Sequence, residues 1–188
     1  MIDFKKARFV VSAPSPSLAP KDGIPAVLMI GRSNVGKSTL LNALMGQKIA
    51  FASKKAGKTK LLNFFLVDDS LYLVDAPGYG STGYATMSTI HFATMMEDYV
   101  KVPSLKAICL LLDLRRDPGE DDKKFVSYLQ NTGKPIIAIL TKVDQMNQSE
   151  LHKAEVRAKE LGLDRVLKSD LKGKSVDKIR TVIASYGK

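Results

Sequence analysis

The 188-residue chain has a single cysteine and no long hydrophobic run, and each scarcity excludes a class of protein. Cys109 cannot form an internal disulfide, which is typical of a protein kept in a reducing cytosol. The apolar run Ala107 to Leu112 is far shorter than the roughly 18 residues that cross a bilayer. Three N-terminal cations precede only a short apolar run, so no secretory signal is read there. We expect a cytoplasmic protein without a membrane-spanning segment.

The remaining composition is that of an ordinary globular protein. Hydrophobic residues make up 45% of the chain and charged residues 26%, which excludes global disorder. The length is close to the roughly 150 residues of an average domain, and no internal repeat is evident. We expect one domain over residues 26–188, preceded by a proline-containing extended arm, residues 1–25. A monomer is expected, because no obligate oligomer surface is visible.

Acidic residues are missing between Gly23 and Val67, so the positive charge is unevenly placed. The chain carries 29 Lys and Arg against 19 Asp and Glu, a net charge of +10. The cations of the acid-free stretch are Arg32, Lys37, Lys48, Lys54, Lys55, Lys58 and Lys60. A second basic stretch, residues 165–188, closes the chain. This distribution suits a polyanion such as RNA or nucleotide phosphates, and it suits a solvated surface kept for solubility equally well.

Short apolar runs alternate with segments of helical length, a pattern typical of α/β proteins. The expected strands are 26–30, 62–67, 71–74, 107–113 and 136–141, with a weaker one at 165–168. The short link between 62–67 and 71–74 requires an antiparallel hairpin, which we place at the edge of an otherwise parallel sheet. Capping residues predict helices that start near Asp117, Ser149 and Ser175. We expect a three-layer α/β/α fold with a mostly parallel six-stranded sheet and one antiparallel edge strand.

A glycine-rich segment follows the first predicted strand and opens a helix. It reads Gly31, Arg32, Ser33, Asn34, Val35, Gly36, Lys37 and Ser38, which fits G-x-x-x-x-G-K-S, with Thr39 next. The glycines let backbone N–H groups surround phosphate oxygens at a helix N-terminus. Lys37 reaches the β and γ phosphates, and the Ser38 hydroxyl ligates Mg²⁺. The sequence therefore predicts a P-loop NTPase.

A second motif ends the third predicted strand and consists of Asp75, Ala76, Pro77 and Gly78. The Asp75 carboxylate can hold the metal ion through water, and the Gly78 N–H can donate to the γ phosphate. A loop that contacts the γ phosphate reorders when that phosphate is lost. The motif therefore predicts a conformational switch as well as a metal contact.

Guanine is favoured over adenine by a motif that ends a buried strand, Thr141, Lys142, Val143 and Asp144. Guanine presents N1–H and a 2-amino group side by side, and the Asp144 carboxylate can accept from both, whereas adenine lacks this pair. The Lys142 alkyl stem can lie over the base. Near the last weak strand, a backbone N–H can donate to guanine O6 from the segment Lys168, Ser169 and Asp170.

Two other functions are compatible with parts of these patterns. A P-loop ATPase or small-molecule kinase would share residues 31–38 but would not need Thr141 to Asp144. An RNA-binding module with a purely structural nucleotide would share the basic stretches. Nucleotide preference and the effect of Lys37→Ala on partner binding separate these alternatives from a GTPase.

The motifs together resemble the EngB family of the TrmE-Era-EngA-EngB-septin-like GTPases. The resemblance runs through G-R-S-N-V-G-K-S-T-L-L-N-A-L at 31–44, G-K-T-K-L-L-N-F-F at 57–65, D-A-P-G-Y-G at 75–80, D-L-R-R at 113–116, T-K-V-D at 141–144 and S-D-L-K-G at 169–173. It implies GTP binding and slow hydrolysis with Mg²⁺, a role with the large ribosomal subunit precursor, and a link to cell division and septation. Asp170 stands where the family has a small residue, which places a carboxylate near the base.

The resemblance also implies GTP contacts by a further segment, Gly57, Lys58, Thr59, Lys60 and Leu61. It implies that Thr59 joins Ser38 on Mg²⁺ and acts with Lys37 and Gly78 on the reacting phosphate. Tyr79 stands where many GTPases have a water-orienting glutamine, so we predict a slow intrinsic rate. Some GTPases of this class hold K⁺ with an asparagine at the position of Asn34, which makes stimulation by K⁺ a hypothesis.

Overall fold

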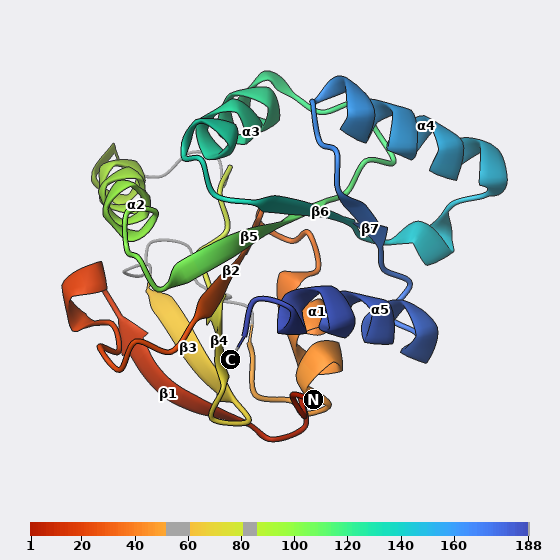
Figure 1. Cartoon of the computed structure of the whole chain (residues 1–188). Coiled ribbons are helices and arrows are strands. Elements are labelled where there is room, and N and C mark those ends of the chain that lie inside the picture. Colours follow the sequence, from red (N-terminus) through yellow and green to blue (C-terminus); the bar gives the residue numbers. More distant parts are fainter. Residues whose placement is uncertain (52–60, 81–85, 188) are drawn as a thin grey trace.

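The computed structural model describes residues 1–51, 61–80 and 86–187, with the backbone alone for 86–90. A central β-sheet lies between two layers of helices (Figure 1). The helices are α1 (Lys37–Met45), α2 (Thr86–Tyr99), α3 (Glu120–Asn131), α4 (Gln148–Glu160) and α5 (Gly173–Ala184), with short 3-10 turns at Pro16–Leu18 and Val143–Gln145. Helices α1 and α5 cover one face, and α2, α3 and α4 cover the other. The expected three-layer α/β/α class is confirmed.

The sheet has seven strands in the order β1-β3-β4-β2-β5-β6-β7. The strands are β1 (Ala7–Ala13), β2 (Ala26–Gly31), β3 (Leu62–Val67), β4 (Leu71–Asp75), β5 (Leu105–Leu112), β6 (Ile136–Leu140) and β7 (Val166–Lys168). Strands β4, β2, β5, β6 and β7 pair in parallel, and β3 is antiparallel to both of its neighbours. The carboxyl ends of the parallel strands therefore meet at one edge, where ligands bind in open α/β sheets.

The seventh strand, β1, comes from the segment expected as an extended arm, so six strands is an undercount. It pairs with β3, which is consequently the second strand of the sheet rather than its edge. The strand has a bulge between Phe9 and Val11, and several of its side chains are at least partly exposed. The apolar run in this edge strand, Phe9 to Val11, is only three residues long, which is why the sequence pattern did not reveal the strand.

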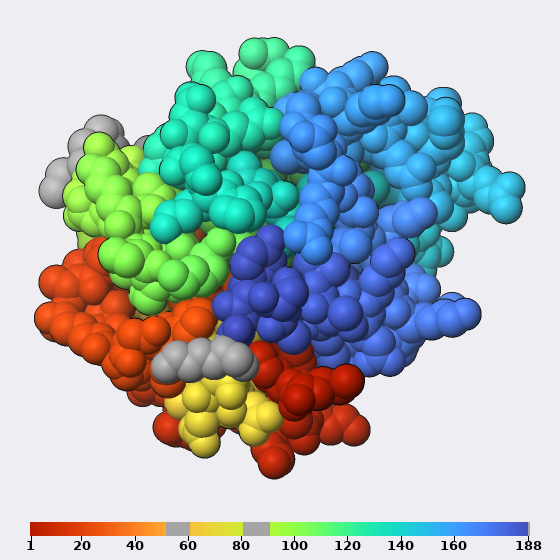
Figure 2. All heavy atoms as spheres, in the orientation of Figure 1, coloured from red at the N-terminus to blue at the C-terminus, as the bar shows by residue number. Residues whose placement is uncertain are grey.

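The N-terminal residues are held against the far end of the β3–β4 hairpin. The backbone N–H of Asp3 donates to the Asp68 carboxylate at 2.9 Å, and the Asp68 N–H donates to the Lys6 carbonyl at 2.7 Å. In both Figure 1 and Figure 2 the N-terminal segment lies beside this hairpin turn. β1 is thereby fastened to the sheet along its length and at its start.

Three helices begin at positions other than those predicted, and the hydrogen bonds of the capping residues account for the differences. Asp117 does not cap α3, because its carboxylate accepts from the Arg157 guanidinium at 2.8 Å; Gly119 and Asp122 form the cap instead. Asn147 caps α4 in a reciprocal arrangement with Glu150. Helix α5 begins at Gly173, since the Ser175 hydroxyl is used by Asp170 and the Lys172 carbonyl.

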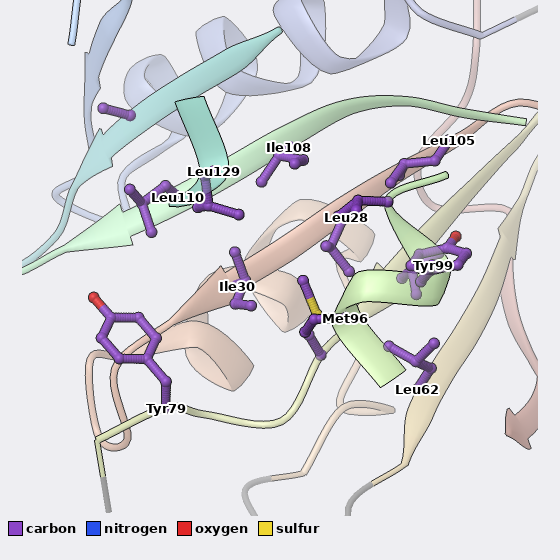
Figure 3. Close-up of a cluster of buried hydrophobic side chains, with 14 of the residues drawn as sticks. Leu28, Ile30, Leu62, Tyr79, Met96, Tyr99, Leu105, Ile108, Leu110 and Leu129 are labelled. Atoms are coloured by element: carbon purple, nitrogen blue, oxygen red, sulfur yellow. The ribbon is translucent and has the colours of Figure 1, made fainter. Parts of the chain in front are cut away.

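Two hydrophobic clusters hold the layers together, one on each face of the sheet. Leu28, Ile30 and Leu110 point toward Met96 of α2 and Leu129 of α3 (Figure 3). Side chains on the opposite face of β2, β4 and β5 pack against α1 and α5. The central strands are thus buried on both faces, as their continuously apolar sequences predict. No helix in the described ranges is both long and apolar enough to span a membrane.

Candidate functional site

The predicted P-loop joins β2 to α1 at the carboxyl edge of the sheet. A side chain at Gly31 would lie 2.8 Å from Val35 and 2.9 Å from the Leu111 carbonyl, so only glycine fits there. Asn34 and Gly36 have left-handed backbone conformations, with φ of 67° and 101°. Gly36 is the N-cap residue of α1, directly before Lys37. The segment therefore forms a tight turn that ends at a helix N-terminus, as phosphate binding requires.

Lys37 and Asp75, predicted from separate motifs, form an ion pair. Their side chains are 12% and 6% exposed, so both charges are largely removed from water. Burial raises the pKa of the Asp75 carboxyl, and the Lys37 ammonium and the Asn63 amide act against this rise. A buried carboxylate needs such partners, because an unpaired charge in this position is costly.

Asn63, which sequence reasoning did not assign to the site, links Asp75 to the edge strand. It lies directly opposite Asp75 in the register of β3 and β4, and its side-chain amide lowers the pKa of the Asp75 carboxyl against the effect of burial. The Ser12 hydroxyl on β1 donates to Asn63 Oδ1 at 2.5 Å. The only sequence signal for this role would have been the register that places Asn63 opposite Asp75, and a register between strands is not visible in local patterns.

The segment after Asp75 lies directly against the P-loop. The Ser33 N–H donates to the Tyr79 carbonyl at 2.9 Å, and the Tyr79 N–H donates to the Gly31 carbonyl at 3.2 Å. Arg32 and Tyr79 thereby form a parallel β-bridge. A side chain at Gly78 would lie 2.9 Å from Ser33 Cα. The predicted γ-phosphate-sensing segment therefore contacts the P-loop backbone in this form of the protein.

The Tyr79 side chain is buried at one end of the hydrophobic cluster in Figure 3 and is 7% exposed. Its ring stacks on Phe125 of α3 at 4.2 Å between centroids, and its hydroxyl donates to Asp122 at 3.1 Å. Arg32 donates to the same carboxylate oxygen at 3.3 Å. Burial and the Asp122 charge raise the pKa of Tyr79 well above its ordinary value. The phenol is therefore neutral and fixed against α3.

The predicted base-recognition residues lie after β6 and beside the P-loop. Thr141 is buried, and Lys142 has a left-handed backbone with φ of 60°. The Lys142 ammonium donates to the Asn34 carbonyl at 3.3 Å and lies 3.5 Å from the Asp113 carboxylate. Asp144 follows in a short 3-10 turn with an exposed side chain. Lys142 thus connects the two loops that are predicted to hold the base and the phosphates.

The segment Lys168 to Asp170 lies next to this motif. The Val143 N–H donates to the Ser169 carbonyl at 3.4 Å, and the Ser169 N–H donates to the Leu140 carbonyl at 2.8 Å. The Asp170 carboxylate accepts from the Ser175 hydroxyl at 2.6 Å and from the Lys172 N–H at 2.9 Å. These hydrogen bonds lower the pKa of Asp170. Its carboxylate is therefore occupied at the start of α5.

Hard oxygen donors at the carboxyl edge fit Mg²⁺ chemically. Ser38 is the second residue of α1, and the Asp75 carboxylate lies against the first, Lys37. No group of three or more His, Cys, Asp and Glu side chains in the described part of the chain could hold a metal by itself. Mg²⁺ usually keeps several waters and binds substrate phosphates besides one or two protein ligands, so this sparse donor set suits it.

The remaining predicted segment falls largely in a gap of the described chain. Gly57, Lys58, Thr59 and Lys60 lie outside the described residues, and Leu61 immediately precedes β3.

Comparison with known proteins agrees with this geometry. A family model described as 50S ribosome-binding GTPase matches residues 26–142. A protein of Solibacter usitatus named "Probable GTP-binding protein EngB" is 38% identical over 182 residues, covering 96% of this chain and 95% of that protein. Its namesake from Lactobacillus helveticus is 40% identical over 157 residues, covering 82% and 80%.

Solved structures share the fold at lower sequence identity. The crystal structure of another "probable GTP-binding protein engB" has a TM-score of 0.65 at 19% identity, covering 86% of this chain and 97% of that one. Era from Aquifex aeolicus, bound to GDP and AlF4⁻, has a TM-score of 0.67 at 22% identity, covering 87% and 56%. The fold and the P-loop, together with the GTPase family model and the similar GTP-binding proteins, define a P-loop GTPase, an enzyme that hydrolyses GTP. Within that class, the chain belongs to the EngB family, and the resemblance seen in the sequence is confirmed.

Proposed function

We propose that this GTPase is a nucleotide-dependent switch in assembly of the large ribosomal subunit. It acts in the cytoplasm as a monomer, and it is required for normal cell division and septation. The observation that supports the switch is the hydrogen bond between Ser33 of the P-loop and Tyr79, the residue that follows Gly78. The family model's description as a 50S ribosome-binding GTPase supports the choice of partner.

In this proposal the Lys37 ammonium exchanges one anionic partner for another. In the described form it pairs with Asp75, and on GTP binding it turns to the β and γ phosphates. Ser38, Thr59 and, through water, Asp75 would hold Mg²⁺, which would neutralise negative charge on the phosphates. The backbone N–H groups of the P-loop and of the Gly78 segment hold the phosphate oxygens. Gain and loss of the γ phosphate thereby change what the Gly78 segment contacts.

Hydrolysis is slow in this proposal, because Tyr79 does not orient the attacking water. Its hydroxyl is bonded to Asp122, and its ring is stacked on Phe125. A partner must therefore supply the missing transition-state stabilisation, or K⁺ must do so near Asn34. Equal GTPase rates in K⁺ and Na⁺ buffers, together with an unchanged rate for Asn34→Ala, would exclude the potassium contribution.

Guanine is selected by Asp144, whose exposed carboxylate is free to accept from N1–H and the 2-amino group. Lys142 covers the base with its alkyl stem while its ammonium remains on the Asn34 carbonyl and Asp113. Thr141, Val143 and the Lys168–Asp170 segment supply the surrounding backbone.

The contact with ribosomal RNA is proposed to involve the amino-terminal half of α5. Lys172, Lys174 and Lys178 are exposed there, and no ion pair is found for them among the described residues. Figure 2 shows α5 on the molecular surface beside the β7 segment and α4. Unpaired surface cations of this kind release counterions from a nucleic acid, which makes binding salt-dependent. Arg115 is a weaker candidate, since Asp113 and Gln145 occupy its guanidinium.

Sedimentation with purified large-subunit precursor particles tests this surface. We expect the triple variant Lys172→Ala, Lys174→Ala and Lys178→Ala to bind less tightly than the wild type and to lose part of the salt dependence. A charge-matched control replaces Lys21, Lys106 and Lys124, which are exposed on other parts of the molecule. Equal weakening by both triple variants would contradict a specific role for α5.

A further inference from the structure

Three polar side chains form one row across the edge of the sheet. Ser12 of β1 lies opposite Asn63 of β3, and Asn63 lies opposite Asp75 of β4. Phe65 and Leu73 each lie two residues from Asn63 and Asp75 along the same strands, and both pack in the cluster beneath α1 and α5. Asn63 and Asp75 therefore face the same side of the sheet, where α1 begins with Lys37.

The hydrogen bonds in this row fix the orientation of the Asn63 amide. The Ser12 hydroxyl donates to Asn63 Oδ1 at 2.5 Å, which directs the amide oxygen toward β1. The Nδ2 group is then directed toward Asp75, whose carboxylate can only accept. An amide turned the other way would place its oxygen against the oxygen of the Asp75 carboxylate, whereas the Ser12 hydroxyl can accept as well as donate. The contact with Asp75 therefore selects the orientation, and the hydrogen bond from Ser12 holds it.

Asn63 can remain beside Asp75 when a nucleotide binds, whereas Lys37 turns to the phosphates. When Lys37 turns to the phosphates, the buried Asp75 carboxylate loses the hydrogen bond from the Lys37 ammonium. A buried carboxylate without a hydrogen-bond donor is unfavourable, and a donor on a strand in the sheet does not move with the loops. The amide of Asn63 satisfies both conditions.

We propose that Asn63 is a positioning residue for Asp75 and that Ser12 holds the Asn63 amide in place, so that β1 contributes to the metal and phosphate site. This inference rests on the proposed role of Asp75 as an outer ligand of Mg²⁺. Groups that orient metal ligands in this way typically change metal affinity about 10- to 100-fold when they are removed.

The test measures how Mg²⁺ slows the dissociation of a fluorescent GDP analogue. Asn63→Leu keeps the approximate volume but removes the donor, and we expect it to raise the half-saturating Mg²⁺ concentration by about tenfold or more. Ser12→Ala should raise the half-saturating Mg²⁺ concentration by a smaller factor. Ser12→Thr keeps a hydroxyl at this position and should have the wild-type value. Dissociation without Mg²⁺ should stay unchanged in all three variants. The matched control is Ser70→Ala, which removes a 2.8 Å hydroxyl hydrogen bond at the opposite end of the same hairpin.

The possible results distinguish failure of the positioning role from failure of the proposed role of Asp75. Unchanged Mg²⁺ dependence in Ser12→Ala and Asn63→Leu, or an equal shift in Ser70→Ala, overturns the positioning role. Ser12→Ala keeps the test decisive if Asn63→Leu does not fold. If the wild type itself shows no Mg²⁺ effect, the proposed role of Asp75 fails and this inference fails with it. The ribosomal role is measured independently of all these variants.

Discussion

The Tyr79 hydroxyl donates a hydrogen bond to Asp122 at 3.1 Å, which binds the segment after Gly78 to helix α3. Arg32 of the P-loop reaches the same carboxylate oxygen at 3.3 Å. One carboxylate therefore joins the phosphate-binding loop, the proposed switch and a helix of the opposite layer. A change at the γ phosphate could be transmitted to α3 through this junction.

Tyr79→Phe tests whether the Tyr79 hydroxyl stabilises the fold or takes part in GTP hydrolysis. Loss of one buried hydrogen bond should reduce the free energy of unfolding by about 0.5–1.5 kcal/mol, because Asp122 keeps Arg32 as a partner. The single-turnover rate of GTP hydrolysis should remain within about twofold of the wild type, since the hydroxyl faces α3. Urea unfolding and a rapid-quench assay measure the two quantities. A rate reduced to a tenth or less would show that the hydroxyl takes part in hydrolysis.

Gly78→Ala should separate the proposed switch from the P-loop. The added Cβ would lie 2.9 Å from the Ser33 Cα, and a backbone atom in a tight turn cannot move away cheaply. We expect at least a tenfold loss of GTP hydrolysis with GDP affinity largely retained, because the GDP phosphates do not need this segment. Gly173→Ala is the control, since nothing lies within 4 Å of its added Cβ. Equal activity of both variants would contradict the close approach.

Lys37→Met leaves the Asp75 carboxylate buried without its cation. Breaking a buried ion pair on one side typically costs about 3–5 kcal/mol. Because burial raises the pKa of Asp75, the folded variant binds a proton there more tightly than the unfolded chain does. The stability deficit relative to the wild type should therefore be largest at neutral pH and shrink as pH falls toward that raised pKa. Urea titrations of the nucleotide-free proteins measure this deficit. A deficit that stays constant across pH would show that it does not arise from an unpaired Asp75 carboxylate.

Asp144→Ala and Asp170→Ala should differ in their effect on nucleotide choice. Without the Asp144 carboxylate, the preference for GTP over ATP should fall by at least about a hundredfold, given the roughly 10⁴-fold discrimination that such contacts supply. Asp170→Ala should leave GTP affinity within about twofold, because Ser175 and the Lys172 N–H occupy the Asp170 carboxylate. Displacement of a fluorescent nucleotide by GTP and ATP gives both values. A similar loss in the two variants would place Asp170 against the base.

Local patterns were sufficient for the elements that flank the site. The P-loop could be predicted because its residues are contiguous in the sequence, and because the left-handed backbone at Gly36 favours glycine. Strands β2, β5 and β6 were predictable because burial on both faces leaves them continuously apolar. The helix starts were less predictable, since Arg157 takes the Asp117 carboxylate across 40 positions of sequence.

The contacts that join the motifs could not be predicted in the same way. Asn63 reaches Asp75, and Ser12 reaches Asn63, only through strand register, which depends on the whole sheet. Tyr79 was recognised as a departure from glutamine, but its burial against Phe125 depends on where α3 packs. The sequence predicts Asp170 near the base, and its hydrogen bonds to the Ser175 hydroxyl and the Lys172 N–H depend on how the chain enters α5.

The most direct test of the switch is the affinity of the wild-type protein for large-subunit precursor particles in two nucleotide states. Quantitative sedimentation with a non-hydrolysable GTP analogue and with GDP gives the ratio. If the Gly78 segment couples the γ phosphate to the partner surface, the two affinities should differ by about tenfold or more, which corresponds to about 1.4 kcal/mol of coupling. Equal affinities in the two states would contradict a nucleotide-dependent switch.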